Sequence, residues 1–218
     1  PRSPYHVSWY PVPSGVPANP SVAVKARPAG GEWQTVPVSR ARAKQIDANT
    51  GSGPVFNSSV ATFDFKGTVE VAVTSSKGAI GTARIRPLSY DTEFTVDGAT
   101  VSFTLTEPRN LSLEIDGEKF DNLQLHANPI ETKCPDPDDP DVIYFGPGLH
   151  KTTDNVVQVP SGKTLYLAGG AVLTCRVEFQ QVENARLIGR GVLYNSPSGV
   201  LVNYSKNIEI DGILRRQP

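Results

Sequence analysis

A short apolar pattern recurs three times in the second half of the chain, at intervals of about twenty residues. Residues 164–169, 185–189 and 208–212 form short β-favouring runs that end in Gly169, Gly189 and Gly212, spaced 20 and 23 residues apart. The alternation of apolar and polar side chains in these runs indicates strands rather than helices. A regular period in the low twenties is typical of solenoids, in which stacked coils bury a hydrophobic face that one coil cannot cover alone.

We therefore predict that residues 142–218 form about three opening coils of a right-handed parallel β-helix. One alternative stays open at this point, because the strands of an ordinary sandwich also recur at short regular intervals with turns between them.

The sequence of the first 127 residues predicts short strands, because its apolar residues alternate with polar ones and show no helical spacing. Alternating runs occupy residues 21–27, 60–65, 68–74 and 83–87, whereas residues 40–54 predict a polar excursion that ends in a loop. Two hairpins are predicted where Asp-Gly separates alternating runs, since that dipeptide suits a turn with positive φ. The first joins residues 93–96 to 100–105, and the second joins 111–115 to 119–125. Residues 1–127 are thus expected to be an all-β sandwich.

Residues 128–141 are rich in proline and aspartate, which predicts an extended linker. Its four aspartates are Asp136, Asp138, Asp139 and Asp141. Hard cations prefer carboxylate oxygens, so a calcium site is an alternative. The closely spaced prolines oppose the tight wrap of a cation loop, and a solvated acidic linker is the favoured interpretation.

Charge and hydropathy exclude two classes of partner. The chain has 218 residues and a net charge of −1, with 12 basic and 12 acidic residues up to position 128 and 9 and 10 after it. Without a basic stripe, nucleic acid is not an expected partner. No apolar run approaches the roughly 18 residues of a membrane span.

Because the chain begins at Pro1 and contains no methionine, we expect a processed or trimmed product.

Two features bear on the compartment. Cys134 and Cys175 could form one disulfide between the linker and the second coil, or remain two buried thiols, because geometry decides between the two. Asn57, Asn110 and Asn203 each begin an Asn-x-Ser/Thr tripeptide, the acceptor pattern for N-glycosylation. Together with the high proline and glycine content, these acceptors favour an extracellular, secreted protein.

Residues 143–148, 162–172, 187–193 and 205–213 resemble the first coils of the pectinase-type β-helix glycoside hydrolases, which include the polygalacturonase and the dextranase–isopullulanase families. Upstream, residues 83–90 and 108–117 resemble the β-sandwich that precedes the helix in some of these enzymes. The resemblance implies hydrolysis of an α-linked polysaccharide with inversion, which requires one carboxylic acid and one carboxylate.

The family's catalytic stretches do not occur here, so no catalytic residue is carried over. The adjacent aspartates Asp138 and Asp139 lie in the linker, and Asp211 is expected to have a structural role in a turn. No cofactor-binding or metal-binding motif is present, and no cofactor is expected. Four aromatic residues could stack on sugar rings, although packing roles are favoured for them: Trp9, Tyr10, Trp33 and Tyr90.

Three hypotheses follow. The preferred one is that the chain is the N-terminal part of a secreted polysaccharide hydrolase whose catalytic coils are missing from this chain. The second is a carbohydrate-binding module without catalysis. The third is a structural protein that self-associates through its exposed last coil, because unpaired strand edges recruit partners.

Overall fold

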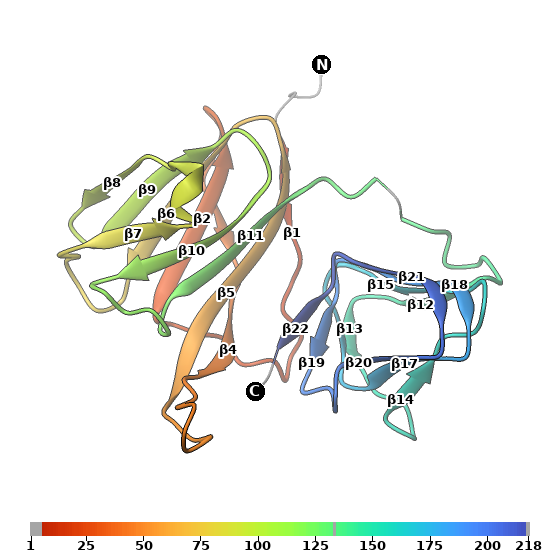
Figure 1. The fold of residues 1–218 in the computed structure, drawn as a ribbon. Coiled ribbons are helices and arrows are strands. Elements are labelled where there is room, and N and C mark those ends of the chain that lie inside the picture. The colour runs from red at the N-terminus through yellow and green to blue at the C-terminus, as the bar shows by residue number, and fades with distance from the viewer. Residues whose placement is uncertain (1–5, 133, 217–218) are drawn as a thin grey trace. The chain divides into compact units, whose positions relative to one another are not determined.

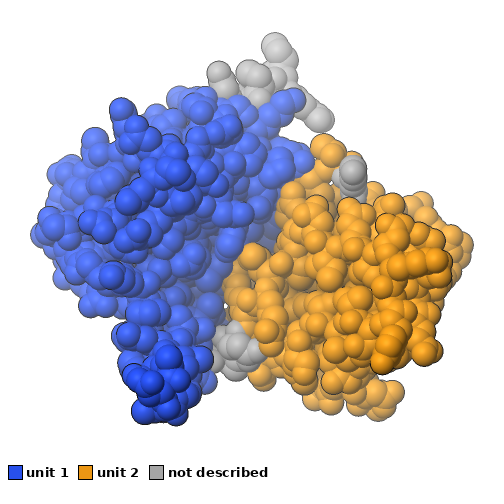
Figure 2. Space-filling model, in the orientation of Figure 1, with its two compact units in different colours: residues 1–10, 17–130 blue, residues 11–16, 131–218 orange. Residues whose placement is uncertain are grey.

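The structure is a computed structural model that describes residues 6–132 and 134–216. The described chain consists of strands, turns and one short 3-10 helix, η1 (Leu88–Tyr90) (Figure 1). It divides into two compact units (Figure 2). Unit 1 comprises the chain up to residue 10 and residues 17–130, and unit 2 comprises residues 11–16 and 131 onward.

Unit 1 contains two sheets. The first has the order β1-β5-β11-β10-β7, with β4 also paired to β5, and the second has the order β3-β2-β6-β9-β8. In the first sheet β5 and β11 are parallel, and the other pairs of unit 1 are antiparallel. The strands of the first sheet are β1 (His6–Trp9), β4 (Val38–Lys44), β5 (Val55–Lys66), β7 (Ala83–Arg86), β10 (Arg109–Ile115) and β11 (Leu123–Pro129). Those of the second are β2 (Val22–Pro28), β3 (Gln34–Val36), β6 (Val69–Ser75), β8 (Phe94–Asp97) and β9 (Thr100–Leu105).

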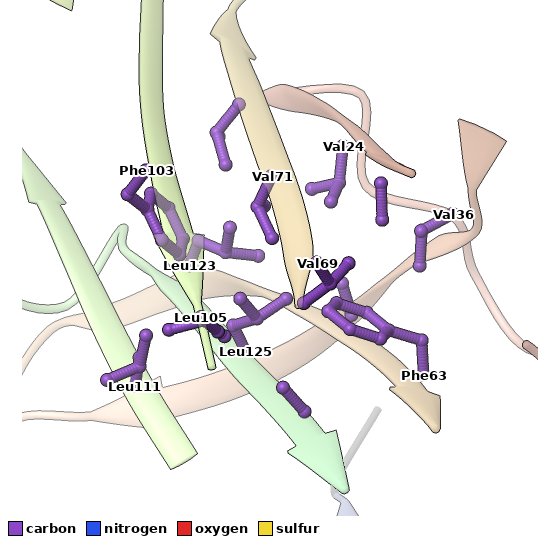
Figure 3. Close-up of a cluster of buried hydrophobic side chains, with 14 of the residues drawn as sticks. Val24, Val36, Phe63, Val69, Val71, Phe103, Leu105, Leu111, Leu123 and Leu125 are labelled. Carbon is purple, nitrogen blue, oxygen red and sulfur yellow. The ribbon is translucent and has the colours of Figure 1, made fainter. Parts of the chain in front are cut away.

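Both sheets contribute to one hydrophobic cluster, shown in Figure 3. Phe63, Leu123 and Leu125 come from the first sheet, and Val24 and Val71 come from the second. These side chains are at most 1% exposed, because successive residues of a strand point to opposite faces and every second residue here is apolar. Full burial of each contributes about 1.5–3 kcal/mol to folding.

The expected strands of unit 1 form, with two differences. The hairpin around Asp97-Gly98 is confirmed, since Phe94 pairs with Phe103 and Asp97 with Thr100. The second hairpin also forms, between β10 and β11, but its return strand begins only at Leu123. Residues 116–122 form a longer loop, in which the side-chain amide of Asn122 donates to the carbonyl oxygen of Lys119 at 2.8 Å.

The other difference concerns residues 40–54. Their first part belongs to β4, which pairs with β5 along its whole length, and only residues 45–54 form a loop. Arginine and lysine alternate with smaller residues in β4, so Arg42 and Lys44 are exposed without a break in the ladder, whereas Arg40 is half-buried.

Unit 2 is a parallel β-solenoid of about three coils, as the sequence predicts. Successive coils each contribute one strand to each of three parallel sheets. The strand orders are β12-β15-β18-β21, β13-β16-β19-β22 and β14-β17-β20 (Figure 1). The first coil contains β12 (Val142–Phe145), β13 (Gly148–His150) and β14 (Val156–Gln158), and the second contains β15 (Thr164–Leu167), β16 (Ala171–Leu173) and β17 (Arg176–Gln180). The third contains β18 (Glu183–Gly189), β19 (Val192–Tyr194) and β20 (Val200–Asn203), and a fourth begins with β21 (Lys206–Asp211) and β22 (Leu214–Arg216).

The solenoid interior is a stack of apolar side chains. Ile143, Leu165, Leu187 and Ile210 occupy the same position in four successive coils. Leu165 and Leu187 are fully buried, and both belong to the hydrophobic cluster of this unit. Ile210, in the last described coil, is 49% exposed.

The linker aspartates are engaged with their own backbone. The Asp136 carboxylate accepts from the amide of Asp138 at 3.0 Å, and the Asp139 carboxylate accepts from the amide of Asp141 at 2.8 Å. The Asp141 carboxylate lies 2.6 Å from Nζ of Lys163. Asp136 and Asp139 thus have a structural role in turns, because the carboxylate of each accepts a hydrogen bond from the backbone amide two residues later.

Candidate functional site

The outer face of the second sheet of unit 1 carries a row of polar side chains. Inward positions of β2, β6 and β9 are buried, so the alternate positions point outward. Arg27 pairs with Glu70 across β2 and β6, and Glu70 pairs with Thr104 across β6 and β9. The guanidinium of Arg27 also forms an ion pair with the Glu70 carboxylate.

If the strand register is extended by one residue at β3 and at β8, one further side chain joins the row at each of its two ends. Gln34 pairs with Ala26, so Trp33 stands beside Arg27. Phe94 pairs with Phe103, so Glu93 stands beside Thr104. The row therefore runs from an indole ring to a carboxylate across the width of the sheet.

A groove of about 630 Å³ lies over this row, and we call it the Trp33 groove. The groove is lined by Arg27, Trp33, Glu70, Val71, Glu93, Phe94, Thr95, Ser102, Phe103, Thr104 and Thr106. Trp33 is 40% exposed, so aromatic surface is accessible. Cζ of Arg27 lies 4.4 Å from the centre of the Trp33 ring, which fixes one side of the indole by a cation–π contact.

The other aromatic residues predicted to stack on sugars lie in different surroundings. Trp9 packs against the hydrophobic cluster of unit 1, and the hydroxyl of Tyr10 donates to the buried Asp64 carboxylate at 3.1 Å. Both residues therefore have packing or anchoring contacts. Tyr90 is 40% exposed, and Cζ of Arg109 lies 4.2 Å from its ring centre. Tyr90 does not line the Trp33 groove.

Three glutamates of the coils form ion pairs. Glu183 lies 2.9 Å from Nζ of Lys206 on the next coil, and Glu209 lies 3.2 Å from Nε of Arg186 on the preceding coil. Glu178 pairs with Arg176 on its own strand. These contacts connect neighbouring coils or neighbouring residues, which is a structural arrangement.

An outward tyrosine of the second coil is covered by the linker. Tyr166 is 2% exposed, stacks on Tyr144 with ring centres 5.5 Å apart, and donates its hydroxyl to Sγ of Cys134 at 3.3 Å. Burial raises the pKa of Tyr166 far above its usual value, and the contacts with Cys134 and the Glu131 carboxylate raise it further. The phenol therefore stays protonated in the folded protein.

The disulfide considered from the sequence is not formed, and both cysteines are free. Cys175 is buried within the solenoid, where its Sγ accepts from the backbone amide of Thr152 at 3.0 Å. Cys134 is exposed in the linker and contacts Tyr166. The two thiols thus occupy different environments, one inside the coil and one outside it, so the alternative of two buried thiols is also wrong for Cys134.

The three glycosylation acceptors lie on strands. Asn57 and Asn110 are exposed, and the Asn110 side chain lies 3.1 Å from Nδ1 of His126. Asn203 is half-buried at the end of β20. Glycosylation at these positions stays a prediction. Among the described residues, no group of three or more His, Cys, Asp or Glu side chains could hold a metal ion.

Comparisons with known proteins identify a fold. No protein-family model matches the chain, and no curated protein matches it in sequence. Among solved structures, Dex49A from Penicillium minioluteum matches with a TM-score of 0.60 and 15% sequence identity. The match covers 87% of this chain and 50% of that one, so the chain spans about half the length of this relative. This likeness shows a shared fold, all-β with a β-solenoid of about three turns.

The sequence indicates Trp33 as a candidate for sugar stacking but does not indicate the groove around it. The signal that could have found the groove is the alternation in β2, β6 and β9, which places Arg27, Glu70 and Thr104 on one face. The order of the strands, which brings these three residues together, is a property of the fold.

In the described part of the chain, no helix is long and apolar enough to cross a membrane.

Proposed function

We propose that this chain is the N-terminal part of a secreted polysaccharide hydrolase that cleaves α-linked glycosidic bonds with inversion. The observation that carries the proposal is the fold likeness to Dex49A, a dextranase, over 87% of this chain. The solenoid supplies a surface on which an extended polysaccharide can lie. In this proposal residues 1–127 are a β-sandwich accessory domain and residues 142–218 are the opening coils, joined by the linker of residues 128–141.

We place the catalytic carboxylates on coils beyond those in this chain. Inverting hydrolysis requires two carboxyl groups roughly 6.5–9.5 Å apart, one to protonate the leaving oxygen and one to activate water. Glu178, Glu183 and Glu209 are held in ion pairs instead. The dextranase match reaches about half of the longer chain, which leaves room for further coils.

The exposure of the last coil supports the same proposal. Val202 occupies the position of Phe179 on the next coil, and Ile210 occupies the position of Leu187 on the next coil. Phe179 and Leu187 are fully buried, whereas Val202 and Ile210 are 44% and 49% exposed. One more coil stacked on β20 and β21 would cover both apolar side chains.

The test is hydrolysis by the protein expressed from the full reading frame of the gene. We expect release of reducing ends from an α-linked polysaccharide such as dextran or polygalacturonate, while the 218-residue chain alone releases none. Proton NMR of the first product molecules should show the anomeric configuration opposite to that of the substrate. Failure of the full-length protein to cleave any α-linked polysaccharide would overturn the proposal, and retention of configuration would overturn the inverting mechanism.

A further inference from the structure

The Trp33 groove has the composition of a binding site for an uncharged sugar chain. We infer that it binds a neutral polysaccharide, with the Trp33 ring as the stacking surface and the row from Arg27 to Glu93 as the polar contacts. This site lies in unit 1 and uses none of the coils. The inference therefore stands independently of the proposed hydrolysis.

The dimensions of the groove suit an elongated ligand. Its volume of about 630 Å³ lies within the roughly 300–1,000 Å³ of small-molecule sites. The row lies on β2, β6 and β9 and ends at Trp33 and Glu93, the residues directly before β3 and β8. Since neighbouring strands are about 4.8 Å apart, the row is about 19 Å long. A chain of several sugar rings fits such a row better than a single compact molecule does.

The position of the indole is set before any ligand arrives. Arg27 lies over the Trp33 ring at 4.4 Å, and the Arg27 guanidinium is itself held by the Glu70 carboxylate. Trp33 nevertheless remains 40% exposed. A ring that is already oriented loses little conformational freedom on binding, which favours affinity.

The groove matches both kinds of surface on a pyranose ring. A sugar ring has faces of C–H groups, which can lie against the exposed apolar surface of the Trp33 ring. Its hydroxyl edges can donate to the carboxylates of Glu70 and Glu93 and can exchange hydrogen bonds with the Thr104 hydroxyl.

The charge of the groove selects against acidic polymers. One cation, Arg27, is balanced by Glu70, and Glu93 leaves a net charge of −1 among the residues that line the groove. A polyuronate would bring further carboxylates close to Glu93, and like charges repel at short range. Hydroxyl groups of a neutral glucan instead find acceptors, since ionised carboxylates accept strongly.

The test measures binding of dextran, a neutral α-glucan, and polygalacturonate, an anionic polymer, to the 218-residue chain by isothermal titration calorimetry. Dextran should bind, and Trp33→Ala should weaken that binding at least about tenfold, whereas Trp33→Phe should retain most of it. The matched control is Tyr90→Ala, which removes an aromatic ring of equal exposure, also covered by an arginine, from outside the groove. The control should bind dextran as the unmodified chain does.

Two further measurements keep the test decisive if Trp33→Ala folds poorly. Glu93→Lys changes an exposed side chain and reverses the local charge, so it should improve binding of polygalacturonate relative to dextran. Dextran should also change the tryptophan fluorescence of the unmodified chain, and this change should vanish in Trp33→Phe. The inference is overturned if neither polymer binds, if polygalacturonate binds more tightly than dextran, or if Trp33→Ala and Tyr90→Ala have equal effects.

Discussion

The carbonyl oxygen of Leu167 lies 2.1 Å from the position that a Cβ atom on Gly189 would occupy. The next coil repeats the arrangement, because a Cβ atom on Gly212 would lie 2.1 Å from the carbonyl oxygen of Gly189. Real Cβ atoms do not approach a backbone atom this closely. Both glycines also have positive φ, +128° and +76°. Close stacking of the coils at this corner therefore requires the absence of a side chain.

Gly189→Ala should destabilise unit 2 by about 3–5 kcal/mol, from overpacking against Leu167 together with backbone strain at positive φ. The control is Gly148→Ala, which has nearly the same φ, +129°, but whose added Cβ would have its nearest neighbour at 3.9 Å, and which should cost only about 1–3 kcal/mol. Urea denaturation of the two variants checks the difference. Equal loss of stability would show that the contact with Leu167 has no separate cost.

The two cysteines should differ in reactivity. In native protein a thiol reagent such as Ellman's reagent should modify Cys134 quickly and Cys175 only after unfolding, because Cys134 is exposed and Cys175 is buried. Cys134→Ser should abolish the fast phase, and Cys175→Ser should leave it unchanged. Intact-mass analysis under non-reducing conditions should show two free thiols. A mass lower by two hydrogen atoms, with no labelling, would instead show a disulfide.

The buried phenol of Tyr166 should make unit 2 sensitive to alkali. Its folded-state pKa is raised, while in the unfolded chain a tyrosine ionises near pH 10. Above about pH 10 the unfolded state therefore releases a proton that the folded state retains, so the free energy of unfolding falls as pH rises. Tyr166→Phe should flatten this decline between pH 9.5 and pH 11 in thermal unfolding. An unchanged slope would contradict the assignment to Tyr166.

The exposed last coil should promote self-association of the 218-residue chain. Strands β20, β21 and β22 each end their sheet among the described strands, and Val202 and Ile210 are exposed beside them. Sheet edges with exposed apolar side chains recruit other strands. Light scattering should therefore show concentration-dependent growth in mass, and Ile210→Lys should reduce it. The control is Ile46→Lys, which changes an isoleucine of unit 1 that is 63% exposed but lies in a loop and not on a sheet edge. A clean monomer at high concentration would contradict this prediction.

The sequence predicts the solenoid but places its register slightly wrongly. Gly169, Gly189 and Gly212 suggest one equivalent position, yet the strand register pairs Gly189 with Leu167, 22 residues earlier. The turn after Leu167 is longer than the turn after Gly189, since Val172 pairs with Val192. Gly169 therefore lies in the longer turn. Apolar periodicity reports which residues face inward, whereas turn lengths vary from coil to coil without changing that periodicity.

The candidate site could be predicted only in part, for a related reason. Alternation within one strand indicates that Arg27 or Glu70 faces outward, but the sequence does not say that β2, β6 and β9 are neighbours. Trp33 and Glu93 come from opposite edges of the sheet and are 60 positions apart. The cysteine state likewise depends on which side of a coil each thiol faces, and spacing alone does not determine this.

The most direct test of the central claim is the native transcript beyond the codon for Pro218. The account predicts an open reading frame that continues with β-favouring runs at intervals of about 20–23 residues and carries at least two carboxylates on later coils. Such a continuation would place the catalytic pair on the coils that cover Val202 and Ile210. A stop codon directly after Pro218 would contradict the proposed hydrolase.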